Sequence, residues 1–91
     1  MLQTKIGMSI KELQFLIHRR GTFTFTDGNS MEGMIVSRYD IPMGRVEYYF
    51  IHADDILAYD KARAEHDREV QRKLGTRIED SSISSAILAA A

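Results

Sequence analysis

The sequence predicts a small, mainly β domain with flanking helices, in which short antiparallel strands form a barrel. Three observations predict this fold class. Apolar and polar residues alternate over Thr22–Thr26, as in a half-buried strand. Turn-forming residues separate this stretch from two further runs of apolar residues. Gly33 interrupts the second run, at a point where a barrel strand would bend.

An N-terminal helix is predicted to precede the strands. Ser9 and Glu12 have the spacing of a capping box, in which each side chain binds the backbone N–H of the other residue. Arg19 and Arg20 would lie in the last turn, where positive charge complements the helix dipole, and Gly21 would end the helix. The apolar face consists of residues at helical spacing, namely Ile10, Leu13, Leu16 and Ile17.

The first two strands are predicted to form a hairpin. Phe23 and Phe25 point to the same side of the first strand. Asp27 and Gly28 favour a tight type I′ turn, whose two central residues both need a positive φ. The second strand follows over about Met31–Tyr39.

Two further strands are predicted after a second turn. Ile41–Gly44 carries proline and glycine where turns favour them. Arg45–His52 is rich in aromatic and β-branched residues, which is typical of a strand. Alternation places Tyr48 toward the core and Tyr49 on the opposite face. Ile56–Asp60 is predicted to be a last, short strand.

The C-terminal third is predicted to be a helical extension. Lys61–Leu74 is polar and has a helical pattern, and Gly75 would end that helix. Ile83 and Ile87 are four residues apart, so the tail either contains a short helix or frays. The chain would therefore divide into residues 1–60, with the N-terminal helix and the barrel, and residues 61–91, with the polar helix and a tail whose order is left open.

Two motifs carry a family resemblance that covers about residues 9–60. An apolar–any–apolar pattern is followed by spaced glycines and apolar residues that lead to an aspartate, in the residues Phe23, Phe25, Gly28, Met31, Gly33, Ile35 and Asp40. The segment Ile51–Tyr59 is similar to a second motif. Together they resemble the Sm-like family of small β-barrels, including its Hfq-like members. The resemblance implies a barrel that closes rings by strand addition and binds RNA.

The spacing between the two motifs departs from the family. Only eleven residues separate Asp40 from His52. That length suits one strand and a turn rather than two strands and a loop. One strand would therefore be lost, or the barrel would be a reduced, SH3-like version, and whether it has four or five strands is left open.

Six residues are candidates for RNA contacts. His52 stands where the second Sm motif has arginine, and with Tyr39 and Tyr49 it could contact bases. Positive charge for phosphates would come from the first helix, through Lys11, Arg19 and Arg20. Five of them also have a structural alternative. His52 would bond a neighbouring backbone group, Tyr49 would pack at an interface, and the basic residues would form a solvated helix surface.

Composition argues against an enzyme. The 91 residues contain no cysteine, and the three histidines lie far apart without metal-ligand spacing. No phosphate-binding glycine loop or nucleophile motif is present, so we expect no catalytic residue, metal or cofactor. Net charge is −1, and the strand region carries two arginines against six carboxylates, which does not favour a nucleic acid.

Two functions remain open from the sequence. The first is a non-enzymatic Sm-like module that associates with RNA as a homo-oligomer through open strand edges. The second is an SH3-like structural or protein-interaction barrel without nucleic-acid affinity, whose partner docks on residues 61–91. Neither involves a membrane, because no apolar run is long enough to span one. Without a signal peptide pattern or cysteines, we expect a cytoplasmic location.

Overall fold

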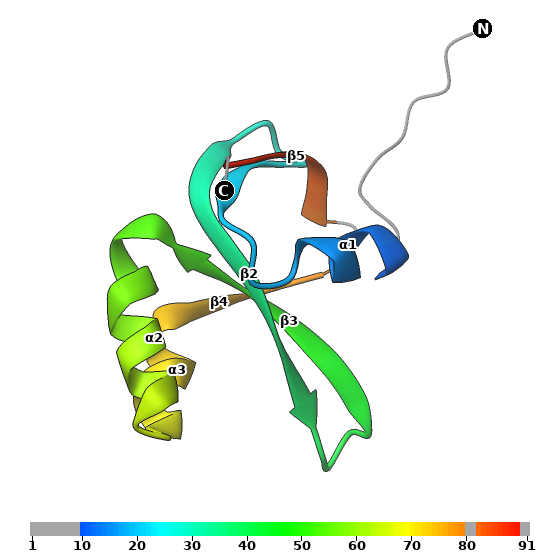
Figure 1. The fold of residues 1–91 in the computed structure, drawn as a ribbon. Coiled ribbons are helices and arrows are strands. Elements are labelled where there is room, and N and C mark those ends of the chain that lie inside the picture. The colour runs from blue at the N-terminus through cyan, green and yellow to red at the C-terminus, as the bar shows by residue number, and fades with distance from the viewer. Residues whose placement is uncertain (1–9, 80–81, 90–91) are drawn as a thin grey trace, which may run out of the picture.

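A computed structural model describes residues 10–79 and 82–89 of the chain (Figure 1). These residues form a mainly β structure with a few helices, which confirms the fold class at this level. In chain order the elements are α1 (Ile10–Leu16), β1 (Gly21–Phe25), β2 (Ser30–Asp40), β3 (Arg45–His52), a 3-10 turn (Ala53–Asp55), α2 (Ile56–Ala64), α3 (Arg68–Leu74), β4 (Gly75–Ile78) and β5 (Ile83–Leu88).

The five strands form one antiparallel sheet in the order β4-β3-β2-β1-β5. The last strand therefore returns to lie beside the first, while β4 pairs with β3 at the opposite edge. The sheet is not closed, because no strand ladder joins β4 to β5 in the described part of the chain.

β2 is the long, curved strand at the centre of the sheet (Figure 1). Gly33 pairs with Gly21 of β1 on one side and with His52 of β3 on the other. A Cβ atom at Gly33 would lie 2.2 Å from the carbonyl oxygen of Ile51 and 2.6 Å from the ring of Phe50. Glycine is needed here because two strands and an aromatic ring crowd against its backbone.

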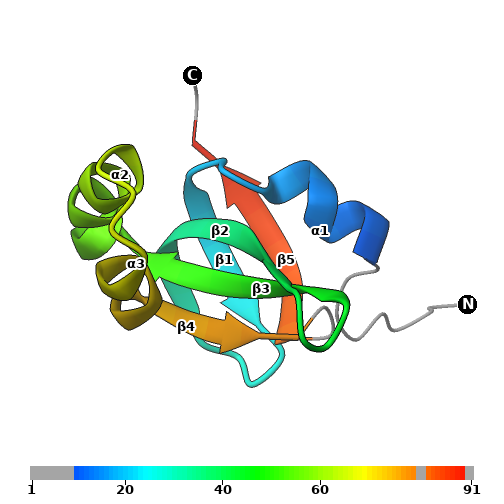
Figure 2. The ribbon, with the colours of Figure 1, turned by 90° about the horizontal axis from the view of Figure 1, so that it is seen from below.

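Each face of the sheet has its own apolar core. Alternation along β2 points Ile35 to one face and Met34 and Val36 to the other, so all three are buried. The first core lies under α1 and contains Leu13, Leu16, Phe23, Ile35, Tyr48, Phe50, Ile78 and Ile83. The second lies under α2 and contains Met34, Val36, Ile51, Ile56 and Tyr59. The helices accordingly lie on opposite sides of the sheet (Figure 2).

The first hairpin is confirmed, but its turn is not type I′. Gly28 has a φ of 94°, whereas Asp27 does not have a positive φ. The Gly28 N–H donates to the carbonyl of Phe25 (2.9 Å), and the Phe25 N–H donates to the carbonyl of Asn29 (2.7 Å). This is a three-residue loop with a left-handed glycine. The Asp27 carboxylate fixes it by accepting from the Asn29 N–H at 2.9 Å.

The strand predicted at Ile56–Asp60 is wrong, because this segment begins α2. Its buried residues are Ile56, Tyr59 and Ala62, three apart, which is a helical rather than an alternating pattern. The single helix predicted over 61–74 is wrong as well. The chain turns at residues 65–67, where His66 has a φ of 58°, and Asp67 caps α3 by accepting from the Val70 N–H at 3.2 Å.

The C-terminal helical extension is also corrected. Residues 75–78 and 83–88 are strands of the same sheet, and they bury Ile78 and Ile83 in the first core. The division of the chain expected after residue 60 would cut through α2, which runs from Ile56 to Ala64. Arg19 and Arg20 lie beyond the end of α1 rather than in its last turn. The proposed cap at Ser9 lies outside the described residues.

Candidate functional site

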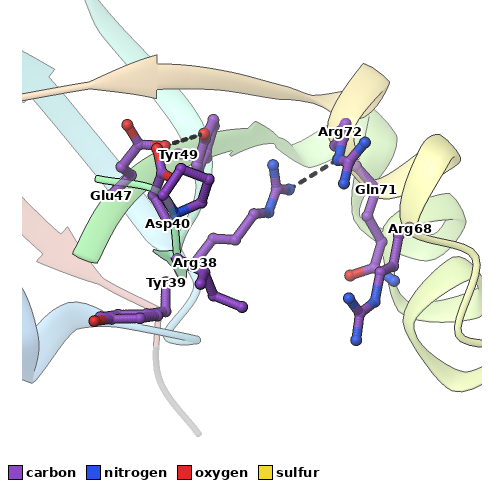
Figure 3. Close-up of a pocket in the computed structure, with 10 residues that line it drawn as sticks. Arg38, Tyr39, Asp40, Glu47, Tyr49, Arg68, Gln71 and Arg72 are labelled. Carbon is purple, nitrogen blue, oxygen red and sulfur yellow. Dashed lines mark hydrogen bonds between the residues drawn. The ribbon is translucent and has the colours of Figure 1, made fainter. Parts of the chain in front are cut away.

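A cleft of about 790 Å³ opens between α3 and the distal half of the β2–β3 hairpin (Figure 3). It is lined from the sheet by Arg38, Tyr39, Asp40, Ile41, Pro42, Glu47 and Tyr49, and from the helix by Arg68, Gln71 and Arg72. We call it the arginine cleft. Its lining contains three arginines, whereas two other cavities of the described chain contain one and two.

The helix wall is set by how α3 packs. Leu74 packs against the second core, and the Gln71 side chain donates to the Ala62 carbonyl of α2 at 3.4 Å. Arg68 and Arg72 are four residues apart, so both project from one side of the helix. Both are exposed.

Arg38 connects the two walls. Its guanidinium donates to the Gln71 carbonyl of α3 at 3.4 Å and lies 4.3 Å from the centre of the Tyr49 ring. This second contact is a cation–π interaction, which restrains the guanidinium. Figure 3 shows Arg38 reaching from β2 across the cleft toward α3.

Glu47 is the carboxylate that the sheet wall already neutralises. Its oxygens accept from the Tyr49 hydroxyl at 2.9 Å and lie 3.3 Å from Arg77 and 3.7 Å from Arg45. Its side chain is only 13% exposed. Burial, and then the hydrogen bond to Glu47, raise the pKa of Tyr49 above its ordinary value, so the hydroxyl stays protonated and keeps donating.

Positive charge remains available in the cleft. Arg38, Arg68 and Arg72 form no ion pair with any carboxylate of the residues that the structure describes. Asp40 is the remaining acidic side chain of the lining, and it accepts from the Met43 N–H at 3.3 Å. Guanidinium groups in such a setting favour carboxylate or phosphate oxygens, which they can bind through two parallel hydrogen bonds.

The hairpin beside the cleft ends in exposed apolar side chains. Ile41 is 79% exposed and Met43 is 62% exposed. Tyr39 and Val46, which pair across the two strands, are also exposed. Such a group of exposed apolar side chains on a small domain is typical of an interaction surface.

Two of the six predicted site residues lie at this cleft, Tyr39 and Tyr49. They do not form one stacking platform. Tyr49 pairs with Val36 and packs on the second core, whereas Tyr39 pairs with Val46 on the opposite face of the hairpin. Tyr49 is also covered by Arg38. Its ring thus lies between the Arg38 guanidinium and the second core.

The other four predicted residues lie elsewhere. The His52 ring nitrogen Nδ1 accepts from the Asp54 N–H at 3.2 Å, so His52 caps the turn that follows β3. Lys11 is exposed on α1, and Arg19 and Arg20 are exposed between α1 and β1. Arg20 lines a separate cavity of about 390 Å³. The structure therefore does not gather the six residues into one site.

Sequence reasoning missed the arginines of the cleft. The sequence pattern places Arg38 only in a strand, and Arg68 and Arg72 only in a polar helix. Their i, i+4 spacing is a usable signal once a helix is predicted. The meeting of α3 with the β2–β3 hairpin is a tertiary contact that spacing along the chain does not reveal.

Neither a metal site nor a membrane-spanning helix appears over residues 10–79 and 82–89. No three acidic, histidine or cysteine side chains gather there to hold an ion. None of the helices in this part of the chain has the length and apolar character needed to cross a bilayer. In comparisons with protein-family models, curated proteins and solved structures, no match to the chain was found.

Proposed function

We propose that this protein is a non-enzymatic interaction module whose arginine cleft binds an acidic segment of a partner protein. One observation carries the proposal: Arg38, Arg68 and Arg72 converge on a cleft without a carboxylate partner among the described residues. Charge-assisted bonds from arginine to carboxylate are among the stronger polar contacts at interfaces. The partner would supply the missing carboxylates.

The surroundings of the cleft support a protein partner over RNA. Tyr39 and Tyr49 point to opposite faces, and Arg38 covers the Tyr49 ring, so successive bases would lack a shared stacking surface. The exposed apolar residues Ile41 and Met43 have no role in holding phosphates, whereas a protein partner would cover them.

We propose a partly open barrel, of Sm-like or SH3-like type, as the frame of this module. The first core takes side chains from all five strands, with Ile78 of β4 and Ile83 of β5 in the same cluster. The curvature of β2 around Gly33 favours such wrapping. This arrangement supports a barrel-like core inside an unclosed sheet.

RNA association is the second candidate, favoured by the same three arginines, since guanidinium groups also bind phosphate. In this case a single strand would follow the cleft, and Tyr39 could stack on one base. The resemblance to the Sm-like family favours this function, with His52 and the basic residues near α1 as further contacts.

Titrations with poly-L-glutamate and with short oligo-U and oligo-A RNA test both candidates. We expect saturable poly-L-glutamate binding that weakens with salt and falls roughly tenfold in the Arg68→Gln/Arg72→Gln variant, since each lost charge-assisted bond has a substantial cost. The Arg19→Gln/Arg20→Gln variant is the matched control, because it removes the same charge at residues that do not line the cleft.

The outcomes separate the candidates. RNA binding that is tighter than poly-L-glutamate binding and drops in the Arg68→Gln/Arg72→Gln variant, or in the Arg19→Gln/Arg20→Gln variant and in His52→Ala, would support the RNA function and overturn the protein partner. Absence of poly-L-glutamate binding at low salt, or equal binding by both double variants, would also overturn our proposal.

Self-association through the strand edges is proposed as well. β4 and β5 are the two edge strands, and open edges can pair with another chain. Size-exclusion chromatography with light scattering should therefore detect a species larger than the monomer. A monomer at all accessible concentrations would exclude this assembly without affecting the cleft.

A further inference from the structure

We infer that the acidic partner of the arginine cleft is bound as an extended strand, with acidic residues at every second position and apolar residues between them. This inference rests on the proposed function and specifies its ligand. It follows from the spacing of the arginines on α3 and from the different character of the two walls of the cleft.

The spacing of the two α3 arginines matches a strand. Arg68 and Arg72 are one turn apart on α3, which corresponds to about 6 Å along a helix axis. Side chains on one face of an extended strand repeat about every 6.6 Å. Two carboxylates at positions i and i+2 of an extended segment can therefore face Arg68 and Arg72 at the same time.

The two walls differ in the side chains that they offer. The α3 wall presents Arg68 and Arg72. The hairpin wall presents Ile41 and Pro42 at its turn, next to the charged side chains of its strands, Arg38, Asp40 and Glu47. A strand lying between them would turn alternate side chains to opposite walls. Its acidic residues would face α3, and its intervening apolar residues would cover Ile41, which is 79% exposed.

A helical partner fits this arrangement less well. A helix with its side chains is about 10–12 Å across, and Arg38 already crosses from β2 to the Gln71 carbonyl within the cleft. A helix with its acidic side chains turned toward Arg68 and Arg72 would turn its other faces away from α3, so its match to the hairpin wall would not follow from the same alternation. An extended segment is thinner and satisfies both walls.

Two labelled peptides of the same composition test the inference by fluorescence anisotropy. One repeats Glu-Val in strict alternation, and the other has all its Glu residues followed by all its Val residues. We expect the alternating peptide to bind roughly fivefold to tenfold more tightly, since the second peptide cannot place carboxylates at i and i+2 without turning others toward Ile41.

Two variants locate the effect in the cleft. Arg72→Gln should remove the preference for alternation while leaving weak binding through Arg68. Ile41→Ser should reduce the affinity for the alternating peptide but not for one in which Thr replaces Val. Lys61→Gln is the control, because this cation on α2 does not line the cleft.

The result that overturns the inference is distinct from failure of the proposed function. Equal binding of the two peptides, or tighter binding of a helix-forming peptide with Glu at i and i+4, would exclude an extended partner although the cleft still binds acidic chains. If neither peptide nor poly-L-glutamate binds, the proposed function fails together with this inference.

Discussion

Gly33 shows at the residue scale how one position constrains the sheet. Its missing side chain lets β2 lie against the Ile51 carbonyl oxygen and the Phe50 ring. We expect Gly33→Ala to lower the free energy of unfolding by roughly 2–3 kcal/mol, because backbone atoms rather than a flexible side chain would have to move. Urea denaturation measures this change.

The matched control for Gly33 is Gly28→Asn. Gly28 has a positive φ, which Asn tolerates better than most residues, and nothing lies within 4 Å of its added Cβ. This variant should lose much less stability. Equal losses at the two positions would contradict the close approach at Gly33.

His18 predicts a pH dependence at the junction of α1 and β1. Burial, and then the positive charge of Arg63, lower the pKa of His18 below its ordinary value of 6.5. The unfolded chain therefore takes up a proton more readily than the folded one. The contribution of His18 to stability is present above pH 6.5 and is lost as the pH falls through the lowered pKa.

Thermal unfolding at several pH values tests this prediction. His18 has a φ of 64°, which Asn also tolerates, so His18→Asn removes the titrating group with little added strain. When the pH is lowered from about 7 to 5, the melting temperature of the variant should fall less than that of the original chain. Parallel losses in both proteins would show that His18 does not contribute.

At the element scale, β5 shows that the C-terminal segment is part of the sheet and of its core. Ile83 is completely buried in the first core, and Ile87 of the same strand is 77% exposed. Ile83→Ala should cost roughly 3 kcal/mol of stability, whereas Ile87→Ala should change it by no more than about 0.5 kcal/mol. Chemical denaturation of both variants checks the pair, and similar small effects would mean that β5 does not complete the sheet.

Local patterns predicted some elements and failed at others. Alternation at Thr22–Thr26 and the aromatic run at Arg45–His52 correspond to β1 and β3. β1 buries Phe23 in the first core, and β3 contributes buried side chains to both cores within a few residues of sequence. β5 was missed because its pairing partner, β1, is about sixty residues away. The four-residue spacing of Ile83 and Ile87 also fits a helix. Only the pairing with β1 decides between a helix and a strand for this segment.

The candidate site was predictable to a smaller extent than the strands. The aromatic rings of Tyr39 and Tyr49 make them candidates from the sequence, and both residues line the arginine cleft. Their opposite orientations follow from strand register, but the approach of α3 does not. Arg68 and Arg72 become site residues only because the turn at 65–67 directs α3 back toward the β2–β3 hairpin.

At the scale of the whole molecule, the way in which the helices cover the sheet explains where the arginine cleft lies. α1 covers one face and α2 with α3 covers the other, but the distal half of the β2–β3 hairpin extends beyond these layers (Figure 1). Its apolar residues therefore stay exposed beside the arginines of α3. Charge and apolar surface meet at this border, which is where a partner would gain most from binding.

The most direct test of this account is a nuclear magnetic resonance titration of the ¹⁵N-labelled chain with the alternating Glu-Val peptide. The account predicts that the largest amide shift changes fall on residues 38–41 and 68–72, with little change at Lys11, Arg19, Arg20 and His52. Shift changes centred on α1 and His52, or no saturable change at low salt, would contradict the arginine cleft as the binding site.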